Sequence, residues 1–278
     1  MIRTSLPDMN WRLLFRALLQ RSTTSSLQGE KLGHEFELPM LDAPHAETYK
    51  VQMGFCREEI PLTYFYLLAQ RAQLSAMLSP HFGFRVAGLV HVSNDMSLEA
   101  EPLPSRALIL RTSVHFEVSG DNGSIYVTFD VRFVQGGREL VLCTSRYLAK
   151  RGSRSTKLNL ARDDSRPRAE EALSTWNLPT DMGRRYARLS GDYNPIHLWP
   201  WSARLLGFKR PIIHGMYSVG RAAADIENSV DRPVRRVTTE FLKPLELGST
   251  VALHFDPGNG IYELWSGATL AVRGTIVI

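Results

Sequence analysis

The feature that most constrains the fold of this chain is an order of elements that occurs twice: an apolar helix followed by several alternating strands. In the N-terminal half, apolar residues recur at helical spacing from Leu62 to Leu78. Three runs of alternating apolar and polar residues follow, separated by glycine-containing turns: 107–118, 124–134 and 138–150. This pattern predicts an antiparallel meander with one apolar face.

The C-terminal half repeats this order. We predict a short helix from Asp181 to Ser190, with Asp181 as its N-cap, and a helix of small and apolar residues from His214 to Glu227. Four strands are predicted after it, at 234–243, 250–255, 261–266 and 269–278. An antiparallel sheet with an apolar face needs a cover, which the long helix of each half supplies. The sequence therefore predicts an α+β, double hot-dog fold, with each antiparallel sheet wrapped around a central helix.

The chain has 278 residues, enough for two domains of ordinary size, and 44% of them are hydrophobic, as in a globular protein. The expected organisation has four parts: an N-terminal basic amphipathic segment (1–30), a degenerate hot-dog domain (31–151), a polar linker (152–175) and a catalytic hot-dog domain (176–278).

Three sequence features bear on location. The basic, amphipathic stretch from Met9 to Arg21 suggests a targeting peptide, a helix that seeks a membrane surface, or a helix packed on the domain, and we favour the last. It lacks a small-residue cleavage site, and no apolar run approaches the length of a membrane span. Cys56 and Cys143 are far apart and belong to no CxxC motif, which disfavours a disulfide framework. We therefore expect a cytoplasmic protein without stable membrane insertion.

The formal net charge is +5, and one segment accounts for it. Lys150 to Arg168 holds seven basic and two acidic residues. A basic surface attracts nucleic acid, membranes or small acidic partners, but no zinc-finger, helix-turn-helix or RNP pattern accompanies this one. We interpret the segment as a solvated linker and expect no nucleic-acid partner.

The segment with the most chemical information is Leu189-Ser-Gly-Asp-Tyr-Asn-Pro-Ile-His-Leu198. Gly191 is expected to end the preceding helix because glycine tolerates the left-handed conformation found at helix ends. Pro195 prevents that helix from resuming. Asn194 is suited to local hydrogen bonds that hold the loop in shape. The sequence therefore predicts a rigid loop.

This loop carries two titratable groups, Asp192 and His197. A carboxylate beside an imidazole provides a base and an acid that operate near neutral pH, and the two together can bind one water molecule. A metal site formed by Asp192, His197 and His214 is the alternative, but the spacing matches no usual zinc pattern. We therefore expect no metal.

A second segment, Arg210-Pro-Ile-Ile-His-Gly-Met216, leads into the small-residue helix. Gly215 is expected at the N-terminus of this helix, where backbone N–H groups lack intrahelical partners and the helix dipole favours negative charge. Glycine also lets a ligand approach the backbone closely. These properties predict an oxyanion hole at the Gly215 amide. For His214, both simple packing and a part in the site stay open.

Together, Ser190-Gly-Asp-Tyr-Asn-Pro-Ile-His197 and Pro211-Ile-Ile-His-Gly-Met216 resemble the MaoC-like, R-specific enoyl-CoA hydratase (hydratase 2) family. This resemblance covers residues 176–278. The N-terminal half is similar to the first half of two-domain 3-hydroxyacyl-thioester dehydratases, in Pro61-Leu-Thr-Tyr-Phe-Tyr-Leu-Leu-Ala69 and Gly88-Leu-Val-His-Val-Ser93.

The resemblance implies a hydro-lyase of fatty-acid metabolism. Asp192 and His197 would activate one water for syn addition across a 2-enoyl thioester, and the reverse reaction would dehydrate an (R)-3-hydroxyacyl thioester. The Gly215 amide would bind the thioester oxygen. The family implies no metal, nucleotide cofactor or covalent intermediate. One departure is Ala223, at the position where some hydratases carry a serine.

The substrate is expected to be an acyl-CoA or an acyl-carrier-protein thioester. The residues expected to bind it are Asn194, His214, Lys209 and Arg210. Lys209 and Arg210 flank the active loops, where their charge suits CoA phosphates and acidic carrier proteins alike.

No second site is expected in the N-terminal half. Ser119-Gly-Asp-Asn-Gly123 echoes the active motif but lacks the proline and the histidine, so it is a predicted hairpin turn. His91 is best interpreted as a core histidine. The helix from Leu62 to Leu78 then either lines a channel for longer acyl chains or simply packs in the core.

Two other functions remain as alternatives. A hot-dog thioesterase would share the fold and the substrate but would usually keep its carboxylate on the central helix. A non-catalytic subunit would only bind acyl chains or a partner dehydratase, but it would have no use for Asp192 and His197. A homodimer is compatible with all three functions.

Overall fold

The structure is a computed structural model that describes residues 3–7, 32–120, 123–150, 152 and 171–278. The stretch from Met9 to Arg21 and nearly all of the basic segment up to Arg168 lie outside the described residues. No helix in the described part of the chain is long and apolar enough to cross a membrane.

The chain forms two compact units, and their boundaries do not follow the sequence in a simple way. The first unit combines Met1–Ala43 with Phe65–Asn159, and the second combines Pro44–Tyr64 with Leu160–Ile278. A segment of the N-terminal half therefore packs with the C-terminal half.

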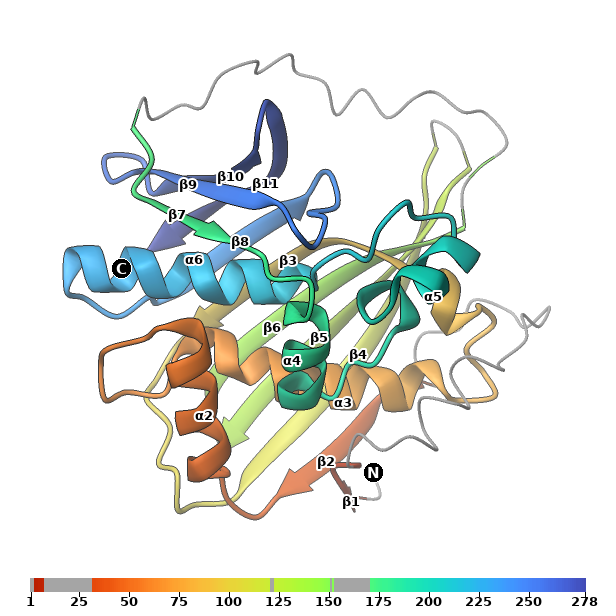
Figure 1. The fold of residues 1–278 in the computed structure, drawn as a ribbon. Coiled ribbons are helices and arrows are strands. Elements are labelled where there is room, and N and C mark those ends of the chain that lie inside the picture. The colour runs from red at the N-terminus through yellow and green to blue at the C-terminus, as the bar shows by residue number, and fades with distance from the viewer. Residues whose placement is uncertain (1–2, 8–31, 121–122, 151, 153–170) are drawn as a thin grey trace. The chain divides into compact units, whose positions relative to one another are not determined.

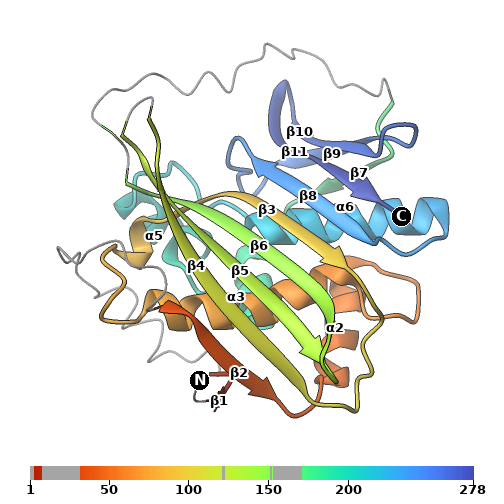
Figure 2. The same cartoon turned by 180° about the vertical axis from the view of Figure 1, so that it is seen from behind.

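The first unit is a sheet with a central helix on one face (Figures 1 and 2). In the sheet the strands follow the order β1-β2-β4-β5-β6-β3. The elements of this unit are β1 (Arg3–Ser5), β2 (His34–Leu38), α3 (Phe65–Met77), the 3-10 turn η3 (Val86–Gly88), β3 (Val90–Leu98), β4 (Leu108–Val118), β5 (Ile125–Gln135) and β6 (Arg138–Lys150). All neighbouring pairs are antiparallel except β1 with β2. The predicted meander is confirmed as β4-β5-β6.

Strand alternation builds the core of this unit. Side chains two residues apart point to the same face of a strand, and on β5 the residues Val127, Phe129, Val131 and Phe133 are completely buried. The ring of Phe65 on α3 packs edge-on against Phe133, with ring centroids 5.3 Å apart. Helix α3 therefore covers the apolar face, as predicted.

The second unit has the same plan. Its sheet order is β8-β11-β10-β9-β7, with all the neighbouring pairs antiparallel. The elements are α2 (Ala43–Met53), the 3-10 turn η2 (Leu62–Tyr64), β7 (Ser174–Asn177), α4 (Met182–Ser190), the 3-10 turn η4 (Pro195–His197), α5 (Pro200–Leu205), α6 (Gly215–Val230), β8 (Arg236–Phe241), β9 (Thr250–Asp256), β10 (Ile261–Ser266) and β11 (Thr269–Val277). The central helix is α6, which contacts β8.

Helix α2 packs on α6 where small residues permit a close approach. A Cβ atom at Gly220 would lie 2.5 Å from the hydroxyl oxygen of Tyr49, so this position of α6 has no room for a side chain. Arg221 Nη1 donates a hydrogen bond to the carbonyl oxygen of Met53 at 2.8 Å, and His45 Nε2 donates to that of Leu189 at 2.8 Å. These contacts explain why Pro44–Tyr64 belongs to the second unit.

The expected helices and the seven expected strands are present, with ends that shift by a few residues. Helix α4 begins after Asp181, but the expected cap is wrong: the Asp181 carboxylate makes no capping hydrogen bond. Its backbone angles (φ −96°, ψ −5°) are helical, whereas a capping residue is usually extended. Among the described residues, six helices and strands were not anticipated, and four of them have six residues or fewer: β1, β2, β3, β7, α2 and α5.

Candidate active site

The loop between α4 and α5 has the rigid form that its sequence predicts. Gly191 ends α4 with φ 75°, and its N–H donates to the carbonyl oxygen of Ala187 at 2.8 Å. Asn194 Oδ1 accepts from the N–H of Ile196 at 3.4 Å, and Pro195 starts the 3-10 turn η4. Backbone and side-chain hydrogen bonds thus define the loop over its whole length.

Asp192 is half-buried at the start of this loop. Its Oδ1 accepts a hydrogen bond from the N–H of Asn194 at 3.1 Å. Its carbonyl oxygen accepts from His214 Nε2 at 2.8 Å. Since His214 immediately precedes α6, this bond ties the loop to the start of the central helix.

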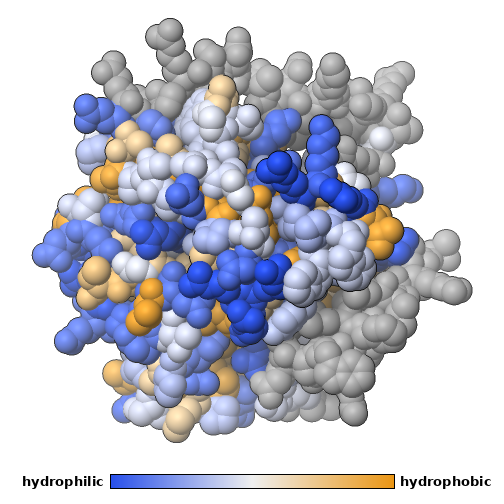
Figure 3. All heavy atoms as spheres, viewed as in Figure 1, coloured by the Kyte–Doolittle hydropathy of each residue, from blue (hydrophilic) through white to orange (hydrophobic). Residues whose placement is uncertain are grey.

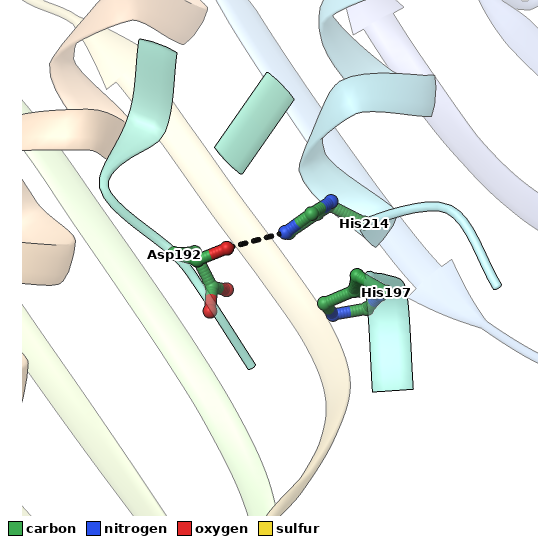
Figure 4. Close-up of side chains that lie close together, drawn as sticks. All are labelled: Asp192, His197 and His214. Atoms are coloured by element: carbon green, nitrogen blue, oxygen red, sulfur yellow. Dashed lines mark hydrogen bonds between the residues drawn. The ribbon is translucent and has the colours of Figure 1, made fainter. Parts of the chain in front are cut away.

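His197 lies at the other end of the loop and is buried. Its Nδ1 donates to the carbonyl oxygen of Ile212 at 2.8 Å. A carbonyl oxygen can only accept, so Nδ1 must carry the proton, and in the neutral ring Nε2 keeps its lone pair. The ring stacks on that of His214 with centroids 3.7 Å apart and an interplanar angle of 28°. Figure 4 shows Asp192, His197 and His214 side by side.

Both imidazoles are held in the neutral form. The pKa of His197 is lowered to about 3, mainly by burial and in part by the neighbouring His214, while Asp192 opposes the shift. Burial also lowers the pKa of His214, again opposed by Asp192. Near pH 7, His197 is therefore a neutral base beside a carboxylate that stabilises its protonated form.

Asp192, His197 and His214 each place a potential ligand atom within 4.8 Å of the other two, so a metal site has to be considered. The Nε2 of His214 carries the proton of the hydrogen bond to the Asp192 carbonyl oxygen. In the neutral ring, the only nitrogen lone pair available to a metal is then that of Nδ1. In Figure 4 this second nitrogen lies on the side of the ring away from Asp192. In this tautomer His214 therefore directs no lone pair toward Asp192.

Gly215 is the first residue of α6, as predicted, with His214 as the N-cap. The first amides of a helix lack intrahelical acceptors, so the Gly215 N–H is suited to a developing oxyanion. We expected a ligand to approach Gly215 closely, but in the structure an aromatic ring lies close to it. A Cβ atom at Gly215 would lie 2.6 Å from Cε1 of Phe241 on β8. Phe241 thus gives the amide an apolar wall, in which electrostatic interactions are stronger.

Tyr186 on α4 is a residue of this site that the sequence analysis missed. Its ring centroid is 4.9 Å from that of His214 and 5.5 Å from that of Tyr217 on α6. The Tyr186 hydroxyl is buried and has no hydrogen-bond partner among the described residues. The only signal in the sequence was its place on the apolar face of the helix before the motif.

Lys209 and Arg210 are exposed and line one cavity of the second unit, which has a volume of about 440 Å³. Three further residues line it that no sequence pattern indicated: Arg184, Trp199 and Arg204. These residues come from three separate segments, so no local spacing indicated that they would meet.

The first unit carries no comparable pair at the two places considered. In the hairpin between β4 and β5, the N–H of Gly123 donates to the carbonyl oxygen of Ser119 at 2.9 Å, which confirms the predicted turn. His91 is half-buried and stacks on Tyr147, with centroids 4.5 Å apart and an interplanar angle of 17°. It packs among aromatic residues, in line with the structural interpretation.

Fold and site together define a hot-dog protein with a carboxylate and two stacked histidines beside the start of its second central helix. Residues 160–259 match the family model described as MaoC like domain. The chain is 25% identical over 234 residues to 3-hydroxyacyl-thioester dehydratase X of Mycobacterium tuberculosis, covering 82% of this chain and 81% of that protein. It is 26% identical over 219 residues to the peroxisomal multifunctional enzyme type 2 of Mus musculus, covering 72% of this chain but only 29% of that enzyme.

The same fold occurs among solved structures. The crystal structure of HtdX from Mycobacterium tuberculosis superposes with a TM-score of 0.70 at 22% identity, covering 87% of this chain and 99% of that one. The expected double hot-dog fold is thereby confirmed. Residues 160–259 thus resemble a MaoC-like domain, and most of the chain is similar in sequence to a 3-hydroxyacyl-thioester dehydratase.

Proposed function

We propose that this protein reversibly hydrates 2-enoyl thioesters and, in the other direction, dehydrates (R)-3-hydroxyacyl thioesters. The observation that carries the proposal is the arrangement of the motif loop. It presents the Asp192 carboxylate and the Nε2 lone pair of His197 together, next to the first amide of α6. This combination supplies a base, an acid and an oxyanion donor within one site.

In hydration, Asp192 and His197 hold one water molecule between them. The water oxygen attacks C3 of the enoyl thioester while one of its protons passes to His197 Nε2. Burial disfavours the resulting imidazolium and Asp192 stabilises it, so it is a ready proton donor. It returns the proton to C2 on the same face, and the addition is syn. All atoms of the water end up in the product, and both side chains recover their initial state.

Between these steps the substrate is an enolate whose charge lies on the thioester oxygen. The Gly215 N–H and the dipole of α6 stabilise this charge. Phe241 keeps water from that side of the amide. No covalent intermediate is needed, because the enzyme only moves a proton and stabilises a charge.

The relatives named above support a thioester substrate, since one is called a 3-hydroxyacyl-thioester dehydratase. We propose that Lys209 and Arg210 bind the charged handle of the thioester. Asn194 and His214 shape the pocket through their bonds to the loop. The proposal includes the domain boundaries at 31–151 and 176–278 and a homodimer. It also includes a cytoplasmic location, for which the main argument is that Cys56 and Cys143 are free.

The thioesterase alternative is less well supported. Helix α3 contains no carboxylate, and the two on α6 lie in its C-terminal half and are engaged. Asp225 pairs with Arg221 at 2.9 Å, and Glu227 accepts from the N–H of Val234 at 2.9 Å. A carboxylate at the start of a central helix, which the thioesterase mechanism would use, is therefore lacking from both.

The test is hydration of crotonyl-CoA. The reaction is monitored through the loss of enoyl-thioester absorbance, and the configuration of the product is determined by chiral analysis. Asp192→Asn and His197→Ala should each lower turnover by about 10²–10⁴, the usual contribution of a general acid or base. His81→Ala, at an exposed position of the first unit, is the matched control and should keep full activity. Near-normal turnover by both loop variants would refute the assignment.

A further inference from the structure

A cavity of about 440 Å³ borders the end of the catalytic loop and the first turn of α4. Four of its ten lining residues are basic, Arg184, Arg204, Lys209 and Arg210, and none of the described residues that line it is acidic. Pockets of this volume bind ligands of the size of a nucleotide. The charges indicate that such a ligand would be an anion.

The cavity also contains a preformed aromatic platform. The guanidinium of Arg184 lies over the ring of Trp199, 4.2 Å from its centroid. Arg184 Nη1 also donates to the carbonyl oxygen of Leu198 at 3.0 Å, which holds the guanidinium in place. Trp199 is nevertheless 45% exposed, so much of the indole remains accessible. A platform fixed before binding loses little entropy when a ligand stacks on it.

The first turn of α4 adds to the attraction for anions. Thr180, two residues before α4, and Arg184, within this turn, both line the cavity. The carboxylate of Asp181 makes no capping bond to the helix amides. The positive end of the helix dipole therefore borders the cavity without a side-chain cap. Basic side chains, a helix N-terminus and an exposed indole together suit a ligand that has both phosphates and a planar base.

We propose that this cavity binds the nucleotide end of coenzyme A, an inference that rests on the proposed thioester hydratase function. Trp199 stacks on the adenine, and Arg204, Lys209 and Arg210 bind the phosphate groups. Arg184 is a positioning residue that holds the indole from its other face.

The cavity is also tied to the catalytic loop through the chain itself. Trp199 comes two residues after His197, and Pro211 immediately precedes Ile212, whose carbonyl oxygen orients that histidine. Binding the nucleotide thus fixes one end of the substrate on the same segments that carry the chemistry, which is how remote binding energy assists orientation.

An acidic carrier protein is the competing partner for a basic surface. Figure 3 shows strongly hydrophilic residues beside hydrophobic ones in the region of α5, where Trp201 and Leu205 are exposed. A carrier protein, however, presents a phosphopantetheine arm without adenine, so the Trp199 platform would have no base to hold. The concave cavity and its indole favour CoA.

The first experiment measures binding of adenosine 3′,5′-bisphosphate by titration calorimetry, which needs no catalysis. Trp199→Ala should weaken binding by about 5- to 100-fold, as expected for loss of a base stacked on an aromatic ring. Trp199→Phe should retain most of the affinity. Arg204→Gln should weaken it by about 10-fold or more, since it removes a charge-assisted hydrogen bond. Arg188→Gln, on the exposed side of α4, is the control and should change nothing. Equal affinities for wild type, Trp199→Ala and Arg204→Gln would overturn the proposal.

The second experiment compares crotonyl-CoA, crotonyl-pantetheine and crotonyl carrier protein as substrates. Trp199→Ala and Arg204→Gln should raise KM for crotonyl-CoA alone, with kcat unchanged, because they remove binding that is equal in ground and transition states. An equal rise in KM for the carrier-protein substrate would assign the cavity to carrier docking and overturn the nucleotide assignment. If wild type hydrates none of the three while adenosine 3′,5′-bisphosphate still binds as predicted, the proposed function has failed and the nucleotide site stands.

Discussion

Both units bury polar side chains between the central helix and its surroundings, but they treat them differently. In the first unit, Gln73 on α3 donates from Nε2 to Ser145 Oγ at 2.9 Å and accepts from the Tyr147 hydroxyl at 3.0 Å. In the second, His197 and His214 each donate one hydrogen bond to a backbone carbonyl and keep a second ring nitrogen as an acceptor.

The difference shows how one architecture serves two purposes. A buried amide whose donor and acceptor are both engaged stabilises one packing arrangement and has no capacity left for chemistry. A buried imidazole costs stability when its second ring nitrogen has no hydrogen-bond partner, yet beside a carboxylate that nitrogen can exchange a proton. The first unit should therefore respond to mutation mainly in stability, and the second mainly in turnover and in its response to pH.

The largest effect that would test this comparison is expected at Gly215. Gly215→Ala places a Cβ atom 2.6 Å from the Phe241 ring, so the ring or the helix start must shift. Displacement of the amide should lower kcat for crotonyl-CoA by about 10²–10³. Gly215→Ala combined with Phe241→Leu should recover part of this loss. Full activity of the single variant in steady-state assays would remove Gly215 from the site.

The second largest effect is expected in the pH dependence of stability, through His197 of the second unit. On unfolding, His197 regains its ordinary pKa of 6.5, whereas in the folded protein its pKa is about 3. Between these values the unfolded chain binds the extra proton, so stability is full above pH 6.5 and falls as the pH decreases toward 3. From pH 7 to pH 5, wild type should lose about 2 kcal/mol more than His197→Asn in urea-unfolding free energy. His214 is present in wild type and in His197→Asn, so it serves as the internal control. Equal losses of unfolding free energy in the two proteins would contradict the lowered pKa of His197.

Gln73→Leu in the first unit should have a smaller and purely structural effect. It removes two hydrogen bonds and leaves the buried Ser145 and Tyr147 with fewer partners, which should cost about 1–3 kcal/mol in urea-unfolding free energy. The kcat of the folded fraction toward crotonyl-CoA should be unchanged. A fall in kcat at full folding would show that the first unit contributes to the chemistry and would break the comparison.

The smallest expected effect is that of chelation. Asp192, His197 and His214 lie close together, but the Nε2 of His214 is engaged with the Asp192 carbonyl oxygen. Hydratase activity should therefore survive exhaustive treatment with EDTA. Loss of activity that zinc restores would replace side-chain water activation by a metal-bound hydroxide.

Several features followed from the sequence because they depend on neighbouring residues. Alternation along 138–150 predicted β6, since side chains of a strand point alternately to its two faces. Gly191 predicted the end of α4, since glycine adopts a positive φ at little cost. The loop that holds Asp192 and His197, and the helix start at Gly215, were predictable for the same reason.

Only the tertiary structure decided which distant segments meet. Pro44–Tyr64 packs with the second unit through Tyr49, Met53 and their contacts on α6, a pairing that no local pattern encodes. His214 donates to the carbonyl oxygen of Asp192, 22 positions earlier, and Arg184 stacks on Trp199 from another helix. Local sequence determines backbone preference and the face on which a side chain lies. The tautomer and pKa of His197 and the charge of the cavity depend on burial and on partners that only the folded chain brings together.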